Sequence, residues 1–368
     1  MSGRAQDMSA IADDSVDLVV TSPPYPMIEM WDRVFARQDR RIAASLAARR
    51  GGEAFELMHA VLDPAWSECG RVLRPGGTAC INVADATRTI AGDFRLYSNH
   101  SRVLGAFLSR GFAALPDILW RKQTNAPAKF MGSGMLPAGA YVTYEHEYVL
   151  VLRKGRRREF VSAEDKARRR ESAFFWEERN RWFSDVWSDI RGAAQEPADR
   201  ALARRSAAFP FELAYRLVCM FSVKGDVVLD PFAGTGTTLA AALAAGRSAW
   251  GIEADRAVLP AMRRRLCRAP AAANAYLRER LARHVRFAAE RTTRSGPLRH
   301  TNVHYGFPVV TAQEREILLN DVAKVDRRAA GRVWTLGVTY QTGPQAEMVR
   351  AWSPADLAAY LGRAVEPA

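Results

Sequence analysis

The chain has 368 residues, of which 48% are hydrophobic and 25% charged, and it carries a formal net charge of +13 with a pI near 10.0. Its length allows one large α/β domain with an appendage or two domains, and its composition is that of an ordinary globular protein. The positive charge indicates a polyanionic partner, most simply nucleic acid, although an arginine-rich proteome would make every protein basic.

The sequence lacks the usual marks of secreted, membrane and zinc-binding proteins. No apolar run reaches membrane-spanning length, and the amino terminus has no apolar signal core. The four cysteines, at positions 69, 80, 219 and 267, form no C-x-x-C pair, so neither a zinc site nor a disulfide framework is indicated. We therefore expect a cytoplasmic protein with no membrane partner and no metal.

The first predicted strand covers residues 16–21 and ends at a double proline. Neither Pro23 nor Pro24 can donate to a sheet, and Pro24 forces Pro23 into an extended backbone. The result is a stiff loop at the carboxyl end of a strand, with Ser22 before the turn and Tyr25 after it. In open α/β sheets, ligands bind at this edge.

This loop carries groups suited to the exocyclic amino group of a nucleobase. The Ser22 hydroxyl and the Pro23 carbonyl could accept its two N–H hydrogens, which favours a tetrahedral nitrogen whose lone pair points at an electrophile. Tyr25 offers an aromatic face for an extruded base. The alternative is structural: a proline-capped loop that closes the strand, with Tyr25 as a packing residue.

Apolar periodicity and turn residues predict the other elements. The predicted helices cover 31–52, 53–73, 101–110, 209–221, 239–245, 256–294, 312–325 and 354–361. The predicted strands cover 78–83, 115–120, 148–152, 227–230, 248–252 and 333–340. Between 115–120 and 148–152 the chain is irregular and too long for a simple hairpin turn, which indicates function.

Several side chains of this irregular segment are candidates for contacts. Trp120 and Asn125 are candidates for lining a base pocket, with Trp120 favoured as a core residue instead. Met131, Met135 and the glycines around them indicate a flexible loop that contacts DNA or a cofactor. Glu145 and Glu147 favour an exposed polar start to the next strand.

Residues 153–205 are basic and aromatic together. They contain 15 Lys and Arg against 10 Asp and Glu, a net charge of +5. Seven aromatic residues are interleaved with these charges: Phe160, Phe174, Phe175, Trp176, Trp182, Phe183 and Trp187. This mixture suits phosphate contact with base stacking, and it equally suits an amphipathic insertion whose aromatic residues are buried.

A second motif follows the predicted strand 227–230. A strand, a glycine-rich turn, a helix, a strand and an acidic residue form a nucleoside-binding βαβ unit, and Glu253 lies 23 residues after Asp230, which suits a carboxylate on ribose hydroxyls. Thr237 stands where a phosphate-binding P-loop needs lysine, and Leu239 where a dinucleotide fingerprint needs its third glycine. Asp230 suits a ligand with a positive amino group, and S-adenosylmethionine has that group and a ribose.

Together the two motifs resemble those of the DNA amino-methyltransferases that make N4-methylcytosine or N6-methyladenine. The resemblance covers about residues 10–260: Ser22–Tyr25 resembles the catalytic tetrapeptide, 230–236 the cofactor motif, and Glu253 the ribose-binding acid. Phe209-Pro210-x-x-Leu213 resembles the element that closes over the methionine portion. The catalytic motif comes first, as in the permuted β group.

The resemblance implies an α/β, Rossmann-like, circularly permuted fold with a mostly parallel seven-stranded-type sheet and one antiparallel strand in the hairpin of 115–120 and 148–152. It implies a catalytic half at 1–152, a target-recognition insertion at 153–205, a cofactor-binding half at 206–294 and an extension of unknown role at 295–368. No strand fits upstream of residue 16. One edge strand is therefore missing, supplied by the carboxyl-terminal region, or lost to a late start codon.

The resemblance also implies the residues of the site. The catalytic residues are Ser22, Pro23, Pro24 and Tyr25, and the cofactor is S-adenosylmethionine, bound by Thr21, Phe209, Pro210, Leu213, Asp230, Pro231, Phe232, Ala233, Gly234, Gly236, Thr237 and Glu253. No metal is needed.

The predicted reaction is methyl transfer to the N4 of cytosine in double-stranded DNA. Within the family that the sequence resembles, Ser at position 22 is associated with methylation of cytosine N4. Alternatives are N6-adenine methylation of DNA, methylation of an RNA base, and an inactive DNA-binding module. Methylation at carbon 5 is disfavoured because no cysteine follows a proline. The expected setting is the nucleoid of a bacterial or archaeal cell, and a homodimer and a cognate restriction endonuclease are compatible with it.

Overall fold

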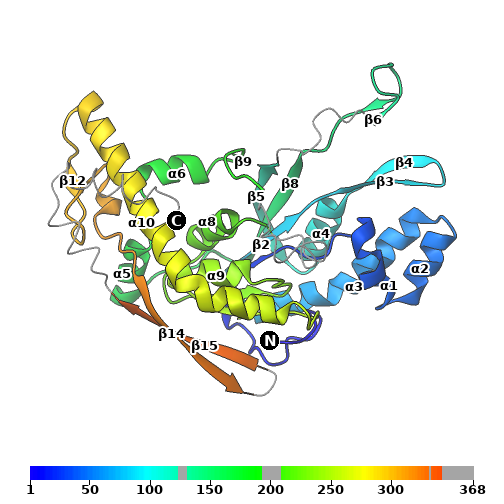
Figure 1. Cartoon of the computed structure of the whole chain (residues 1–368), viewed down its shortest axis with the longest axis horizontal. Coiled ribbons are helices and arrows are strands. Elements are labelled where there is room, and N and C mark those ends of the chain that lie inside the picture. The colour runs from blue at the N-terminus through cyan, green and yellow to red at the C-terminus, as the bar shows by residue number, and fades with distance from the viewer. Residues whose placement is uncertain (123–130, 193–208, 331–332, 342–368) are drawn as a thin grey trace.

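A seven-stranded mixed sheet forms the centre of the molecule (Figure 1). The computed structural model describes residues 1–122, 131–192, 209–330 and 333–341. The strand order is β11 (Ser248–Gly251), β10 (Val227–Asp230), β1 (Val16–Thr21), β2 (Leu73–Val83), β8 (His146–Lys154), β5 (Phe112–Arg121) and β9 (Val186–Trp187). In this sheet β8 runs antiparallel to both neighbours, and the other pairs are parallel. The predicted mostly parallel sheet, with its antiparallel strand in the β5–β8 hairpin, is confirmed.

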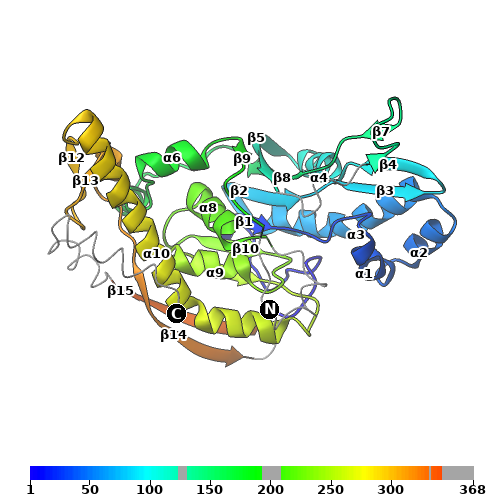
Figure 2. The same cartoon turned by 45° about the horizontal axis from the view of Figure 1, so that its top comes forward.

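Helices cover both faces of this sheet. Leu18 and Val20 of β1 face a core shared with α8 (Phe211–Phe221), α9 (Thr237–Ala244) and α10 (Leu259–Ser295). Val19 faces a second core shared with α3 (Gly51–Val72) and α4 (Asn99–Leu108). A strand buried on both faces needs an almost continuous apolar run, which explains the sequence of β1. Figures 1 and 2 show α8 and α9 on one side of the sheet and α3 on the other.

The other described elements are short or lie outside the main sheet. The helical ones are η1 (Glu29–Trp31), α1 (Asp32–Ala36), α2 (Arg40–Ala47), α5 (Ala163–Glu171), α6 (Trp176–Trp182) and η3 (Ala312–Glu314). The strands form separate pairs: β3 (Ala86–Ile90) with β4 (Asp93–Tyr97), β6 (Met131–Gly132) with β7 (Ala140–Tyr141), β12 (His300–Thr301) with β13 (Pro308–Val309), and β14 (Asp321–Ala330) with β15 (Val333–Gln341). None of the described helices has the length and apolar character to cross a bilayer.

The helix predicted over 31–52 is wrong in extent. The segment divides into η1, α1 and α2, and α3 begins at Gly51. The Asp39 carboxylate accepts a hydrogen bond from the backbone N–H of Arg41 at 2.9 Å and so caps a new helix. Arg49 then adopts a positive φ of 59°, which ends α2 before Gly51.

The helix predicted over 312–325 is also wrong. Only η3 is helical there, because the Glu314 carboxylate bonds back to the backbone N–H of Thr311 at 2.6 Å and closes a single turn. Val322 and Val325 instead pair with β15, in agreement with the strand predicted over 333–340. The helix predicted over 354–361 lies outside the described residues.

The edge of the sheet beside β11 is occupied by the first residues of the chain. Ser2 forms a parallel bridge with Glu253, and the N–H of Gly3 donates to the Glu253 carbonyl at 3.0 Å. This is a single bridge rather than a full strand. The alternative that the carboxyl-terminal region supplies the edge strand is wrong for the described residues, because β14 and β15 pair only with each other.

The aromatic residues of the basic segment 153–205 are largely buried where the structure describes them. Phe175, Trp182 and Trp187 are at most 1% exposed, and the Arg280 guanidinium lies over the rings of Phe175 and Trp182. Phe183 is 39% exposed. The alternative of an insertion with buried aromatic residues therefore holds for these three buried residues, and residues 193–205 lie outside the described part of the chain.

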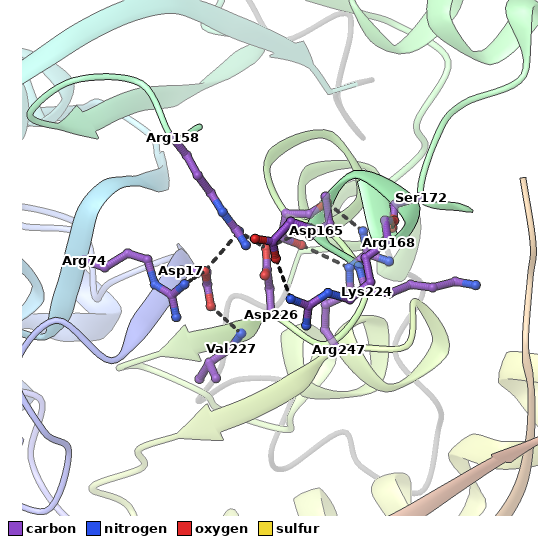
Figure 3. A network of polar contacts seen from close by, with 12 residues as sticks. Asp17, Arg74, Arg158, Asp165, Arg168, Ser172, Lys224, Asp226, Val227 and Arg247 are labelled. Carbon is purple, nitrogen blue, oxygen red and sulfur yellow. Dashed lines mark hydrogen bonds and ion pairs between the residues drawn. The ribbon is translucent and has the colours of Figure 1, made fainter. Parts of the chain in front are cut away.

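A cluster of ion pairs joins the two halves of the domain at the amino-terminal edge of the sheet (Figure 3). Arg158, just after β8, contacts Asp17 of β1 at 3.1 Å and Asp226, just before β10, at 2.6 Å. Arg74 also pairs with Asp17 at 2.8 Å, and the Asp17 carboxylate accepts the N–H of Val227 at 2.8 Å. Burial, reinforced by the charge of Asp226, raises the pKa of Asp17. The arginines therefore compensate two buried carboxylates.

We predict that Arg158→Ala lowers the free energy of unfolding by about 1–3 kcal/mol, because two buried carboxylates then lose a charged partner. Urea unfolding at neutral pH measures this change. The matched control is Arg157→Ala at the exposed neighbouring position, which we expect to stay within about 0.5 kcal/mol of the parent protein. Equal losses in the two variants would contradict a bridging role for Arg158.

Candidate active site

The two sequence motifs meet at the carboxyl-terminal edge of the sheet. β1 and β10 are parallel neighbours in which Leu18 pairs with Val228 and Val19 with Leu229, so the loops that follow them leave the same edge side by side. The Thr21 hydroxyl donates to the Asp230 carboxylate at 2.6 Å, across 209 residues of sequence. This bond joins the last residue of β1 to the last residue of β10.

The Asp230 carboxylate organises the glycine-rich turn. It is 3% exposed and accepts the hydroxyls of Thr21 and Thr238, the latter at 2.7 Å, and the N–H of Phe232 at 3.1 Å. Burial raises its pKa to about 6 although these bonds favour the ionised form. Both Asp230 oxygens already accept hydrogen bonds from the protein, so this carboxylate stabilises the conformation of the turn.

Two glycines of the turn have backbones that favour glycine. Gly234 has φ of +50° and Gly236 of +83°, and a Cβ at Gly236 would meet the Met262 side chain at 3.0 Å. Gly236 therefore lets the turn pack closely against α10. Pro231 and Ala233 are buried, and Phe232 is half-buried.

The Glu253 carboxylate is fixed beside this turn. One of its oxygens accepts the N–H of Gly234 at 2.8 Å, and the other accepts the N–H of Asp255 at 2.7 Å. Burial raises the pKa of Glu253. The residue remains partly exposed. Thr237 is buried, and its hydroxyl accepts a bond from Arg265 at 2.8 Å.

The serine–diproline loop lies beside the turn, with its tyrosine turned inwards. The Ser22 hydroxyl is 2.7 Å from the Tyr25 hydroxyl, and the ring of Tyr25 is 3% exposed in the core beneath the loop. Burial, followed by the nearby charge of Glu147, raises the pKa of Tyr25 well above its ordinary value, so the phenol stays neutral. Tyr25 is therefore a packing residue in this structure, as in the alternative of a proline-capped loop. Its ring has no open face on which a base could stack.

The residues expected to close over the cofactor stand at the start of α8. Pro210 caps this helix, Phe209 is 7% exposed, and Leu213 is fully buried against the core. Leu213 thus holds α8 in place, and all three residues are buried.

Sequence reasoning missed three polar residues of the site. Glu147 was expected on an exposed strand start, but it is 6% exposed and bonded to Tyr25 at 3.0 Å. Asn82 donates to Tyr25 at 2.9 Å, and Lys122 pairs with Glu147. Glu145 does stand at the surface, where it pairs with Arg121. In the sequence, Asn82 and Glu147 are polar residues beside apolar strand residues. That pattern was the signal that could have indicated buried polar side chains at the site.

Two further predictions for this region have different outcomes. Trp120 is 1% exposed, and its indole N–H donates to the Ile190 carbonyl at 3.0 Å, which confirms it as a core residue. Asn125 lies outside the described residues.

Away from the site, Glu177, His284 and Glu314 bring ligand atoms within 4.8 Å of one another. Both His284 nitrogens and both Glu314 oxygens already have partners in the chain, so this cluster is a structural one.

Comparison with known proteins agrees with this geometry. Residues 16–263 match a family model described as DNA methylase of the N6/N4 type. The type II methyltransferase M.MthZI of Methanothermobacter thermautotrophicus is 48% identical over 86% of this chain and 88% of its own length. M.MjaI of Methanocaldococcus jannaschii, also a type II methyltransferase, is 46% identical over 70% of this chain and 87% of its own.

A solved structure is similar as well. A proposed DNA modification methylase from Thermus thermophilus, in complex with S-adenosyl-L-methionine, has a TM-score of 0.57 and 33% identity, over 73% of this chain and 92% of that one.

The raised pKa of Asp230 gives a prediction for stability against pH. The folded-state pKa of about 6 exceeds the ordinary 3.8, so the folded protein holds this proton more tightly than the unfolded chain does. The contribution of Asp230 to the free energy of unfolding therefore falls as pH rises from about 4 to about 6.

Urea unfolding of the parent protein and of Asp230→Asn between pH 4 and pH 7 measures this contribution. We expect the stability of the parent relative to the variant to decrease on the order of 1–3 kcal/mol across this range, because the variant has no proton to lose. A difference that stays constant or increases with pH would contradict the assignment.

Proposed function

This chain belongs to the DNA methylase family of the N4-cytosine and N6-adenine type, and from that premise we propose that it methylates the exocyclic N4 of cytosine in double-stranded DNA with S-adenosylmethionine as donor. The observation that carries the proposal is the Thr21–Asp230 bond, because it puts a nucleoside-binding turn beside a loop shaped for an amine. The hydroxyl at position 22 favours cytosine, and N6-adenine of the same DNA is the alternative.

The glycine-rich turn suits the proposed cofactor. A Cβ at Gly234 would meet only the Phe232 carbonyl, at 4.0 Å, which supports a ligand against this backbone, and the partly exposed Glu253 carboxylate beside it supports bonding to ribose hydroxyls. When bound, S-adenosylmethionine supplies an electrophilic methyl group on sulfur. The thermal stability of the protein should therefore increase when S-adenosylmethionine is added.

The serine–diproline loop orients the acceptor. Ser22 and the Pro23 carbonyl accept the two amine hydrogens, so that the nitrogen lone pair points at the methyl group. The C–N bond forms as the C–S bond breaks, and one amine proton leaves to solvent. Alignment of the two reactants supplies most of the rate, because Ser22 is a weak base and orients more than it deprotonates. In the cell a restriction endonuclease of matching specificity would accompany the enzyme, as the type II names of its relatives suggest.

The direct test is labelled methyl transfer to unmethylated DNA, followed by digestion to nucleosides. We expect N4-methylcytosine. N6-methyladenine would move the assignment to the alternative base, and label in an RNA substrate but none in DNA would overturn the proposal. Sequencing of the methylated DNA then gives the recognition sequence.

Ser22→Ala should lower the turnover about 10–100-fold, because one hydrogen bond that aligns the amine is lost. The dissociation constant for S-adenosylmethionine should change less than about twofold, since the side chain faces the acceptor. Single-turnover methylation and equilibrium dialysis measure the two quantities. Unchanged turnover would remove Ser22 from the acceptor site.

We propose that two hairpins beside the loop contact the DNA. β3–β4 follows β2, and β6–β7 precedes β8, so both project from the catalytic edge (Figures 1 and 2). The rings of Phe94 and Tyr141 stack with centroids 4.6 Å apart and join them. Met135 and Leu136 at the tip of β6–β7 are 85% and 70% exposed, and residues 131–144 carry no charge. Exposed apolar side chains of this kind suit insertion between base pairs.

The double variant Met135→Ala with Leu136→Ala should lower methylation of a duplex about tenfold, because the energy of unstacking the target base is then less well compensated. Most of this loss should disappear on a duplex whose target base is mispaired, because that base leaves the stack easily. The matched control is Val161→Ala, equally exposed at 74% but on the segment before α5. A loss of the same size on both duplexes would contradict insertion.

A further inference from the structure

We infer that Glu147 is a positioning residue that sets the direction of the hydrogen-bond chain ending at Ser22, so that Ser22 turns its lone pairs, rather than its hydrogen, towards the amine of the base. The inference rests on the proposed function and deepens it. It assigns a role to a buried carboxylate that the methyl transfer itself does not require.

The hydrogen-bond chain consists of three side chains from two segments, the serine–diproline loop and β8. The Glu147 carboxylate at the start of β8 lies 3.0 Å from the Tyr25 hydroxyl, and that hydroxyl lies 2.7 Å from the Ser22 hydroxyl. Asn82 at the end of β2 contacts both Tyr25, at 2.9 Å, and Glu147. Lys122 forms an ion pair with the other Glu147 oxygen.

The direction of the hydrogen-bond chain follows from the number of hydrogens that each side chain can donate. An ionised carboxylate only accepts, and a phenol has one hydrogen. The Tyr25 hydrogen goes to Glu147, which is charged and closer than the Asn82 carbonyl at 3.3 Å. The Tyr25 oxygen is then left as an acceptor for the amide of Asn82 and for the hydroxyl of Ser22.

The consequence for Ser22 is specific. Its only hydrogen is used on Tyr25, so the lone pairs of its oxygen remain for the N–H of the target amine. If Glu147 were a neutral amide, it could donate to Tyr25. The Tyr25 hydrogen could then turn to Ser22, and the Ser22 hydrogen would point at the amine N–H and repel it. The high pKa of Tyr25 agrees with this order, because the phenol keeps its hydrogen.

The test is a double-mutant cycle on single-turnover methylation of unmethylated DNA with enzyme in excess. Glu147→Gln should lower the rate about 10–100-fold while the dissociation constant for S-adenosylmethionine stays within about twofold. In a Ser22→Ala background the same substitution should change the rate less than about twofold, because no hydroxyl remains to orient. A role in structure alone would instead add its full loss in both backgrounds.

A second variant guards against a folding defect in Glu147→Gln. Tyr25→Phe keeps the Lys122–Glu147 ion pair but cuts the chain, and it should show the same dependence on Ser22. The control is Glu145→Gln, two residues earlier at the surface, which should leave the rate within about twofold.

The outcomes separate the two proposals. Wild-type protein that transfers no methyl group to DNA would overturn the proposed function. Active wild-type protein with additive losses in the cycle, or a Glu147→Gln variant as fast as wild type, would overturn the role of Glu147 alone.

Discussion

The parallel pairing of β1 with β10 is the constraint on which the active site depends. It brings a loop from the start of the chain beside a turn more than two hundred residues later, and the Thr21–Asp230 bond fixes their separation. Because alternate side chains of β1 pack into two different cores, a slip by one residue would move each of them into the opposite core, where it does not fit the existing packing. The register of a hydrophobic core therefore determines how a methyl donor and an amine would face each other.

The two edges of the sheet carry different groups: ion pairs at the amino-terminal edge and the candidate active site at the carboxyl-terminal edge. At the amino-terminal edge, Arg158 and Arg74 compensate Asp17 and Asp226, beside a cleft of about 630 Å³ that is also lined by Arg156. At the carboxyl-terminal edge, Asp230 bonds to the glycine-rich turn, while the hydrogen bonds of Glu147 and Tyr25 lead to the hydroxyl of Ser22. A rigid far edge keeps the turn and the serine–diproline loop in register, which is what alignment of reactants requires.

Much of the fold and the outline of the site follow from local sequence. The strands 16–21 and 227–230 are apolar runs that end at special turns, so both loops could be placed from sequence. Glu147 could not, because its burial depends on the pairing of β8 with β2 and β5, which sets it opposite Trp120. The inward turn of Tyr25 and the strand at 321–330 in place of a helix likewise follow from tertiary contacts. The acidic and polar residues around Val322 do not form a periodic pattern that distinguishes a helix from a strand.

The decisive measurement is a crystal structure with S-adenosylmethionine bound. We expect the adenosine to lie on the turn around Gly234 with its ribose at Glu253, and the methyl group to face Ser22 and Pro23. A cofactor held elsewhere, for instance in the arginine-lined cleft at the opposite edge, or a methyl group pointing away from Ser22, would contradict this arrangement.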